Sequence, residues 1–421
     1  MSDLAVFDQY ESEVRGYIRS FPVVFERAQG SVLTAEDGTE YLDFFSGAGV
    51  VNYGHNNPVF TEALIGYLQS GGIIHGLDMA TAAKRDFIDA FQRLVLAPRG
   101  LNYKLQFTGP TGANAVESAL KLARQATGRQ NIVAFTNGFH GLSLGALAAT
   151  GNEKYRAAGG VSLGDVTRLP YDGYLGEGID TLDLLERMLD DPGSGLDLPA
   201  AVIVEAIQGE GGINVASAEW LRRLRAITAQ RGILLIVDDI QSGVGRSGQF
   251  FSFEDSGIVP DLVTVSKSIS ASGLPMAILL LRPEIDVWKP GAHTGTFRGN
   301  NLAFVSARVA LETYWADDAF TTQIAERAEQ LGAALKAIAA DFPEAAFTVR
   351  GRGLMCGLAS PSRPELAGAA SQQAFARGVV IETSGARDEV LKFLPALTIT
   401  ADELDRGIAI VRESLAAALS V

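Results

Sequence analysis

The sequence predicts an α/β fold built on a mostly parallel sheet. Three short runs, AAVIVEAI, GILLIVDDI and DLVTVS, are rich in valine and isoleucine and lack polar alternation, which is typical of strands buried on both faces of a parallel sheet. The helical stretch AEWLRRLRAITAQRG separates the first two runs, and alternation of strands with helices is the α/β pattern. The 46 glycines among 421 residues indicate many tight turns, as α/β enzymes use around ligands.

The expected elements change in character along the chain. Residues 22–45 predict an antiparallel hairpin around an acidic-glycine turn, a glycine-rich loop follows, and residues 59–69 have helical spacing. From about residue 104 strands and helices alternate. Beyond about residue 305 two long helical stretches lead into short strands, which indicates a smaller α+β region.

Composition and charge exclude several classes of protein. The net charge is −14 and no basic stripe is present, so we expect no nucleic-acid partner. No uncharged apolar run reaches 18 residues and no signal peptide is evident, so we expect a cytoplasmic protein that does not span a membrane. The single cysteine, Cys356, excludes an internal disulfide. The four histidines are scattered without metal-ligand spacing, so we expect no metal site.

The segment TGPTGANAVES, from Thr108 to Ser118, has the pattern of an anion site. A glycine-rich turn that runs into a helix directs backbone N–H groups and the positive end of the helix dipole at one point, and Thr111 adds a hydroxyl. Such turns also open many helices that bind nothing. The segment lacks the Gly-Lys-Ser/Thr ending of a nucleotide-binding loop, which argues against ATP.

Two further strand ends carry charged side chains. Asp238 closes the apolar run before IQSGVGRSG and is expected to point inward, whereas Asp239 points to the opposite face. By itself Asp238 is better explained as a turn or helix-capping acid. Lys267 follows a buried strand, and by itself it would be an exposed loop lysine.

The combination of these features favours a pyridine cofactor. Its phosphate requires a helix N-terminus, its ring nitrogen an acid and its aldehyde an amine. An aromatic side chain suits its flat ring, and the pair Phe139 and His140 follows an intervening strand.

The chain resembles the class III (ω-amino acid) aminotransferases of pyridoxal phosphate fold type I along most of its length. The segments that carry this resemblance are, in order, DGTEYLDFFSGAGVVNYGHNNP, TGANAVESALKLAR, FHGLSLGA, VEAIQGEGG, VDDIQSGVGRSG, SKSIS and GTFRGNN. The resemblance implies a large domain with a mostly parallel seven-stranded sheet and helices on both faces, plus a small α+β domain built from both chain ends. We expect the small domain to comprise residues 1–70 and 306–421, and the large, cofactor-binding domain residues 71–305.

The resemblance also implies roles for individual residues. Lys267 and Asp238 would be catalytic, the lysine bonded to the cofactor aldehyde and the aspartate paired with the pyridine nitrogen. The cofactor site would include these two and Thr111, Gly112, Ala113, Phe139, His140, Glu205, Gln241 and Thr296. Thr296 would reach the phosphate of the neighbouring subunit, so a homodimer or a dimer of dimers is expected.

The substrate side departs from the usual family pattern. Many members have Ser-Gly-Thr-Glu where this chain has Thr111-Gly112-Ala113-Asn114, which removes one hydroxyl from the phosphate site. Many also have an arginine that holds the substrate carboxylate where this chain has Lys392, and lysine cannot form a bidentate fork. We expect Glu210, Lys392 and Arg298 to bind substrate.

Within the family, residues 21–315 are similar to the diaminobutyrate-forming branch. The segments concerned include FPVVF, HGLDM, LNYKLQFTGPTG, FTNGFHG and PYDGY. This similarity implies L-glutamate as donor, an aldehyde-bearing amino acid, L-aspartate 4-semialdehyde, as acceptor, and a place in ectoine biosynthesis.

Other functions remain open at this point. Within the same fold, the alternatives are aminotransferases of ornithine, GABA or β-alanine and an aminomutase. From other classes, the alternatives are a non-catalytic cofactor-binding regulatory domain and a sugar-phosphate binder. The regulatory domain would require an attached DNA-binding segment, and the sugar-phosphate binder would leave Lys267 unexplained.

Overall fold

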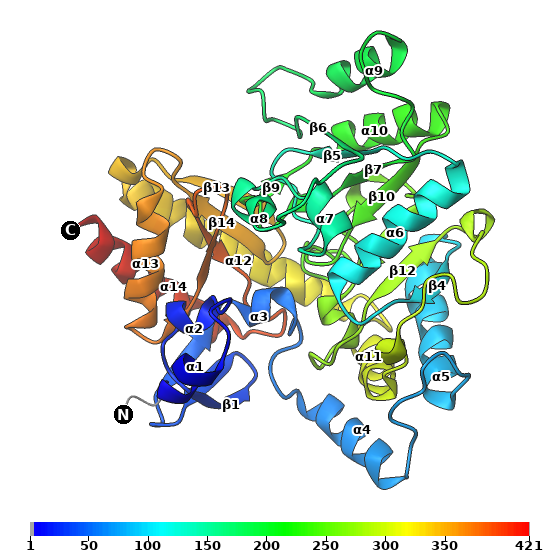
Figure 1. Ribbon diagram of the computed structural model, residues 1–421. Coiled ribbons are helices and arrows are strands. Elements are labelled where there is room, and N and C mark those ends of the chain that lie inside the picture. Colours follow the sequence, from blue (N-terminus) through cyan, green and yellow to red (C-terminus); the bar gives the residue numbers. More distant parts are fainter. Residues whose placement is uncertain (1–3, 421) are drawn as a thin grey trace.

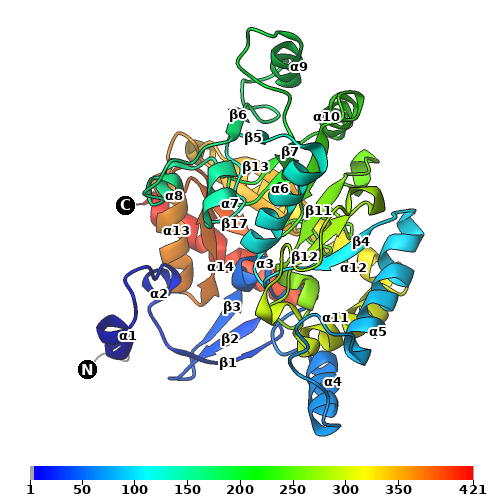
Figure 2. The ribbon, with the colours of Figure 1, turned by 45° about the vertical axis from the view of Figure 1, so that its right-hand side comes forward.

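The computed structural model describes residues 4–420. The middle of the chain, cyan to yellow-green, forms one part, and the dark-blue beginning of the chain lies with the gold to red C-terminal segments on the other side (Figure 1). In the turned view the orange to red C-terminal segments lie partly behind the teal and green middle of the chain (Figure 2).

The helices and strands have the following bounds. Within the described residues the α-helices are α1 (Ala5–Tyr10), α2 (Tyr17–Ser20), α3 (Ser46–Gly49), α4 (Pro58–Gln69), α5 (Ala82–Phe91), α6 (Gly112–Thr127), α7 (Leu144–Ala149), α8 (Glu153–Ala157), α9 (Leu182–Asp190), α10 (Ala218–Gln230), α11 (Asn301–Tyr314), α12 (Ala319–Asp341), α13 (Glu365–Phe375) and α14 (Ala401–Leu419). Short helical turns lie at Gln92–Leu96, Ala97–Arg99, Glu254–Ser256, Lys267–Ser270, Pro283–Ile285, Thr296–Arg298 and Pro343–Ala345. The strands are β1 (Phe25–Gln29), β2 (Val32–Ala35), β3 (Glu40–Asp43), β4 (Lys104–Phe107), β5 (Ile132–Phe135), β6 (Val166–Leu169), β7 (Ala201–Val204), β8 (Ile207–Gln208), β9 (Asn214–Val215), β10 (Leu234–Asp238), β11 (Leu262–Val265), β12 (Ile278–Leu281), β13 (Thr348–Arg352), β14 (Met355–Ala359), β15 (Val379–Val380), β16 (Glu382–Ser384) and β17 (Val390–Phe393).

A seven-stranded sheet forms the centre of the larger part. Its strand order is β4-β12-β11-β10-β7-β5-β6. Strand β12 runs antiparallel to β4 and β11, and the other neighbours are parallel. The predicted mostly parallel seven-stranded sheet is confirmed.

Helices cover both faces of this sheet. Successive side chains of a strand point to opposite sides, so a strand of apolar residues presents apolar side chains to both layers of helices. In β10, Leu235 and Val237 lie in one apolar cluster with Trp220 of α10. Ile236 lies in a second cluster with Leu120 of α6. The valine- and isoleucine-rich runs are therefore buried on both faces, as the sequence indicated.

The chain ends build two four-stranded sheets. In one, β1, β2 and β3 form an antiparallel meander and β15 joins β3 in parallel, so residues from both ends share a sheet. The other, β13-β14-β17-β16, is antiparallel. The antiparallel hairpin predicted around the acidic-glycine turn is confirmed as β2 and β3, but Gly30, at φ 57°, adds a second reversal that divides the first expected strand into β1 and β2.

A buried arginine joins the two parts close to the sheet edge. Arg246, in the loop after β10, is fully buried. Its guanidinium donates to Asn52 Oδ1 at 2.6 Å, to the Leu354 carbonyl at 3.0 Å and to the Pro395 carbonyl. The loop at the end of β10 is thereby tied to both chain ends, and the candidate site lies at this junction.

Among residues 4–420, no helix combines the length and apolar character that crossing a membrane requires. The same residues contain no group of three or more His, Cys, Asp or Glu side chains placed to hold a metal ion.

Candidate active site

A cavity of about 330 Å³ opens where the parallel strands β5, β7, β10 and β11 end. Open α/β sheets bind ligands at this edge. The cavity is lined by Gly112, Ala113, Phe139, His140, Gly141, Leu142, Glu205, Glu210, Asp238, Ile240, Gln241, Ser242 and Lys267. The structure thus brings together nine of the predicted site residues from five separate segments.

Lys267 lies in the short helical turn after β11 and is partly buried. Its Nζ donates a hydrogen bond of 2.7 Å to the Ala48 carbonyl. Ser266 and Ser268 fix the turn on either side, since their hydroxyls donate to the carbonyls of Met276 and Gly49. Burial lowers the pKa of the Lys267 ammonium to about 8, with Glu210 opposing the shift and Lys392 adding to it. This is the environment of a reactive amine rather than of an exposed loop lysine.

Each carboxylate oxygen of Asp238, at the end of β10, has a hydrogen-bond partner. Oδ2 lies 2.7 Å from His140 Nδ1, and Oδ1 accepts from the Thr264 hydroxyl at 3.0 Å. Burial alone would lower the pKa of the His140 imidazole, but the hydrogen bond and charge of Asp238 raise it. Asp239 points to the opposite side as expected, where it accepts hydrogen bonds from Ser242 Oγ and the Ser252 amide.

Glu205 and Phe139 border the same cavity. The Phe139 backbone N–H donates to Glu205 Oε2 at 2.9 Å, which fixes the loop that carries Phe139 and His140. Burial raises the pKa of the Glu205 carboxyl above its usual range. The Glu205 carboxyl, beside Asp238, is therefore more easily kept protonated than the carboxyl of an exposed glutamate.

Helix α6 directs its N-terminus at the cavity. Thr111 is the N-cap, and its hydroxyl accepts from the Asn114 N–H at 3.2 Å. The N–H groups of Gly112 and Ala113, at the first two helical positions, have no acceptor within the helix. A Cβ at Gly112 would lie 3.0 Å from Ile240 Cδ1, so glycine allows the helix to start close to the end of β10.

The loop around Ala48 was missed by reasoning from sequence. Its carbonyl accepts from both Lys267 Nζ and Gln241 Nε2, the latter at 3.1 Å. Gly47 and Ala48 have φ values of 59° and 57°, which turn this carbonyl toward the cavity residues. The signal in the sequence was SGAG, a small-residue turn inside a matched segment.

Gln241 connects the cofactor side of the cavity with a buried ion pair. Its Nε2 donates to Glu210 Oε1 at 3.0 Å, and that oxygen also lies 2.7 Å from Lys392 Nζ. Lys392 is fully buried and lies behind Glu210, outside the cavity lining. Of these expected substrate-binding residues, only Glu210 lines the cavity itself.

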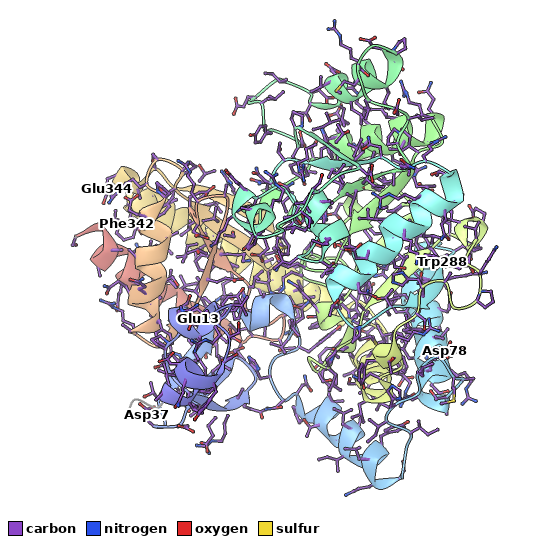
Figure 3. All side chains as sticks on the ribbon, viewed as in Figure 1. Glu13, Asp37, Asp78, Trp288, Phe342 and Glu344 are labelled. Carbon is purple, nitrogen blue, oxygen red and sulfur yellow. The ribbon has the colours of Figure 1, made fainter. Side chains whose placement is uncertain are left out.

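Thr296 and Arg298 lie elsewhere on this chain. Thr296 is exposed, and its carbonyl lies 2.7 Å from His75 Nε2. Arg298 forms an ion pair with Asp78, which Figure 3 labels beside α5. Neither residue lines the cavity formed by the described residues of one chain.

The residues present fit pyridoxal phosphate. An amine, an acid at a strand end, two free backbone N–H groups and a phenyl ring line one cavity. In addition, the Gln241 carboxamide oxygen is buried without a hydrogen-bond donor among the described residues, so it remains available to a bound hydroxyl-bearing ring.

This arrangement on an α/β sheet defines a pyridoxal phosphate-dependent enzyme of the aminotransferase class. The family model described as aminotransferase class-III matches residues 15–415. The chain belongs to the class III aminotransferases.

Relatives and solved structures agree with this assignment. The diaminobutyrate–2-oxoglutarate transaminase of Bordetella parapertussis is 60% identical over 418 residues, which cover 99% of this chain and 96% of that protein. The protein of the same name from Vibrio cholerae is 57% identical and covers 97% of this chain and 99% of its own. The crystal structure of Toxoplasma gondii ornithine aminotransferase has a TM-score of 0.84 at 26% identity and covers 99% of this chain and 95% of its own.

Proposed function

We propose that this chain transfers the amino group of L-glutamate to L-aspartate 4-semialdehyde, which yields L-2,4-diaminobutyrate and 2-oxoglutarate, as a step toward ectoine. The observation that carries the proposal is that Lys267 and Asp238 share one cavity that ends at Glu210, the partner of Lys392. Relatives that are 60% and 53% identical bear the name diaminobutyrate–2-oxoglutarate transaminase, which supports these substrates.

Each residue of the cavity has a proposed part in the reaction. Pyridoxal phosphate, when bound, supplies an aldehyde that carries the amino group and a ring that accepts the electron pair released at the substrate carbon. Lys267 moves a proton to and from that carbon, because its lowered pKa keeps a fraction of the amine unprotonated near neutral pH. Asp238, oriented by His140 and Thr264, keeps the ring nitrogen protonated.

The remaining residues hold the reactants in place. The first N–H groups of α6 and the Thr111 hydroxyl bind the phosphate. Phe139 covers one face of the ring, with Glu205 behind it, and Gln241 meets its phenolic oxygen. Glu210 meets the non-reacting end of the substrate, and Lys392 behind it holds the Glu210 carboxylate in place.

A panel of half-reactions tests this function. Purified holoenzyme is mixed with L-2,4-diaminobutyrate, L-glutamate, L-ornithine, GABA or β-alanine, and the cofactor absorbance and the products are followed. We expect the first two to react and L-glutamate to release one equivalent of 2-oxoglutarate. A faster reaction with ornithine, GABA or β-alanine than with L-2,4-diaminobutyrate would contradict L-aspartate 4-semialdehyde as the amino acceptor. Failure to release an oxo acid from L-glutamate would indicate an aminomutase.

We also propose that the working form is a homodimer or a dimer of dimers, in which Thr296 reaches the phosphate of the neighbouring subunit. The exposure of Thr296 and of Phe297 beside it supports this arrangement. We propose the cytoplasm as the cellular location. A reducing compartment suits a chain whose single cysteine, Cys356, is buried and free.

A further inference from the structure

A buried lysine lies between two carboxylates at the end of the cavity. Lys392 Nζ is 2.7 Å from Glu210 Oε1 and 2.8 Å from Glu382 Oε1, and the lysine side chain is fully buried. Glu382 is 7% exposed, and its second oxygen accepts from the Tyr17 hydroxyl at 3.2 Å. Strands β16 and β17 hold Glu382 and Lys392 directly opposite each other.

One positive charge meets two negative charges in this cluster. Among residues 4–420, neither Glu210 nor Glu382 forms an ion pair with any cation other than Lys392. Burial acts to raise the pKa of Glu210, but Lys392 and Lys267 lower it to about 2. Burial raises the pKa of Glu382 to about 6, with Lys392 opposing. Both carboxylates are therefore mainly ionised above pH 7, and one negative charge is left without a matching cation.

Lys267 balances that charge only while its amine is free. Its charge acts on Glu210 and Glu382, as the lowered pKa of Glu210 shows. When the lysine nitrogen is bonded to the cofactor aldehyde, this ammonium is no longer available to the cluster. The uncompensated carboxylate then faces an arriving amine substrate, and a cation on that substrate restores the balance.

The two carboxylates differ in position. Glu210 lines the cavity, whereas Glu382 lies behind Lys392 and does not. Glu382 therefore acts through the lysine that it holds and through the charge that it adds, and not by contact with the substrate.

We propose that Glu382 is a positioning residue that sets substrate preference: it favours a substrate with an ammonium beside the carboxylate at its non-reacting end over one with the carboxylate alone. This inference rests on the proposed function. L-2,4-Diaminobutyrate carries both groups at that end, and 4-aminobutyrate is the same molecule without the α-amino group. These two substrates differ only in the α-ammonium group, which supplies the positive charge that the cluster of Lys392, Glu210 and Glu382 lacks.

Single-turnover half-reactions of the holoenzyme with both substrates test the inference. In Glu382→Gln, which keeps the size of the side chain and its acceptor oxygen, we expect the diaminobutyrate to 4-aminobutyrate ratio of kcat/KM to fall about tenfold. The change should lie mainly in KM, because the reacting end is untouched. Glu389→Gln is the matched control, since this residue precedes β17 and its carboxylate bonds the Arg387 N–H, and its ratio should equal that of the wild type.

A pH series on the wild type provides a second measurement that needs no variant. The charged or titratable groups that face Glu382 are Tyr17, Tyr155, Lys392, Glu210 and Lys267. Burial raises the pKa of Tyr155, so this residue stays neutral over the range tested. Tyr17 has a raised pKa and stays neutral, Lys392 has a raised pKa and stays protonated, and Glu210 stays ionised. Lys267 is bonded to the cofactor aldehyde when the amine substrate arrives, so its ammonium does not titrate in this comparison. The ratio should therefore fall as the pH is lowered from 8 to 5.5 and Glu382 gains a proton.

The outcomes separate this inference from the proposed function. Equal loss with both substrates in Glu382→Gln, or a ratio that does not change with pH, would show that Glu382 has only a structural role. If Glu382→Gln fails to fold, the pH series decides alone. A wild type that reacts with neither diaminobutyrate nor glutamate would overturn the proposed function instead.

Discussion

Burial determines how Lys267 handles a proton. A lysine in water is almost fully protonated at pH 7, whereas the pKa of Lys267 is lowered to about 8, chiefly by burial. The amine is therefore unprotonated in a useful fraction of molecules near neutral pH. A group that accepts and returns a proton works best when its pKa lies near the working pH.

The first prediction concerns the pH dependence of this lysine. The reaction of the aminated cofactor form with 2-oxoglutarate leaves Lys267 free, so its rate should rise about tenfold between pH 7 and pH 9 as the ammonium loses its proton. Stopped-flow absorbance measures that rate. Lys267→Ala should lower it by about 10²–10⁴ and remove the pH dependence. The exposed Lys289→Ala is the control, and a wild-type rate that is flat across this range would contradict the role of Lys267.

Asp238 supplies a charge that its neighbours keep in place. In Asp238→Asn the shape is retained but the carboxylate is lost, so in its proposed role the residue would no longer hold the ring nitrogen protonated. We expect kcat to fall about a hundredfold or more, with the cofactor still bound. The adjacent Asp239→Asn is the matched control. Burial raises the pKa of Asp239 to about 6 and its partners are Ser242 and Ser252, so its loss should change thermal stability and leave kcat close to the wild-type value.

At the scale of elements, the strands of the large sheet and their charged ends were predictable from sequence. Uninterrupted valine and isoleucine runs require burial on both faces, and a charged residue at the end of such a run lies at the ligand-binding edge. Asp238 and Lys267 follow such runs, and both line one cavity. The positions of the Ala48 carbonyl and Glu382 depend on how distant segments pack and not on any local pattern.

Short strands near the chain ends were less predictable for a similar reason. Strand β15 has two residues and pairs with β3, more than 330 positions earlier, a contact that leaves no periodic signal. The extra turn at Gly30 depends on one backbone conformation that glycine permits but does not demand.

The N-terminus of α6 carries a prediction of its own. Thr111→Ala removes the hydroxyl that accepts from the Asn114 N–H and should cost the helix start about 1 kcal/mol, which corresponds to roughly fivefold weaker cofactor binding if that start holds the phosphate. Absorbance titration of cofactor-free protein measures the affinity. Thr111→Ser keeps the hydroxyl and should bind as the wild type does. Equal loss in both variants would show that the hydroxyl plays no part.

At the scale of the whole molecule, exposed apolar side chains gather near the segment that carries Thr296. They include Val59, Ile65 and Leu68 of α4, then Ile73, Ile74, Leu77 and Met79, and Phe297, which is 68% exposed. His75 and Phe297 are in edge-to-face contact, so these segments are neighbours in space. In Figures 1 and 2, α4 stands out from the body of the molecule. Exposed apolar side chains on these segments suit the proposed subunit interface.

The last prediction follows from that surface. The wild type should elute as a dimer or larger assembly in size-exclusion chromatography with light scattering. Phe297→Glu places a charge in the expected interface and should weaken the dimer by about 2 kcal/mol or more. Because Thr296 is proposed to complete the neighbouring phosphate site, the same variant should lose cofactor as it dissociates. Tyr10→Glu, on the equally exposed α1, is the control and should remain assembled. A wild-type monomer that retains cofactor and full activity would contradict both the interface and the role of Thr296.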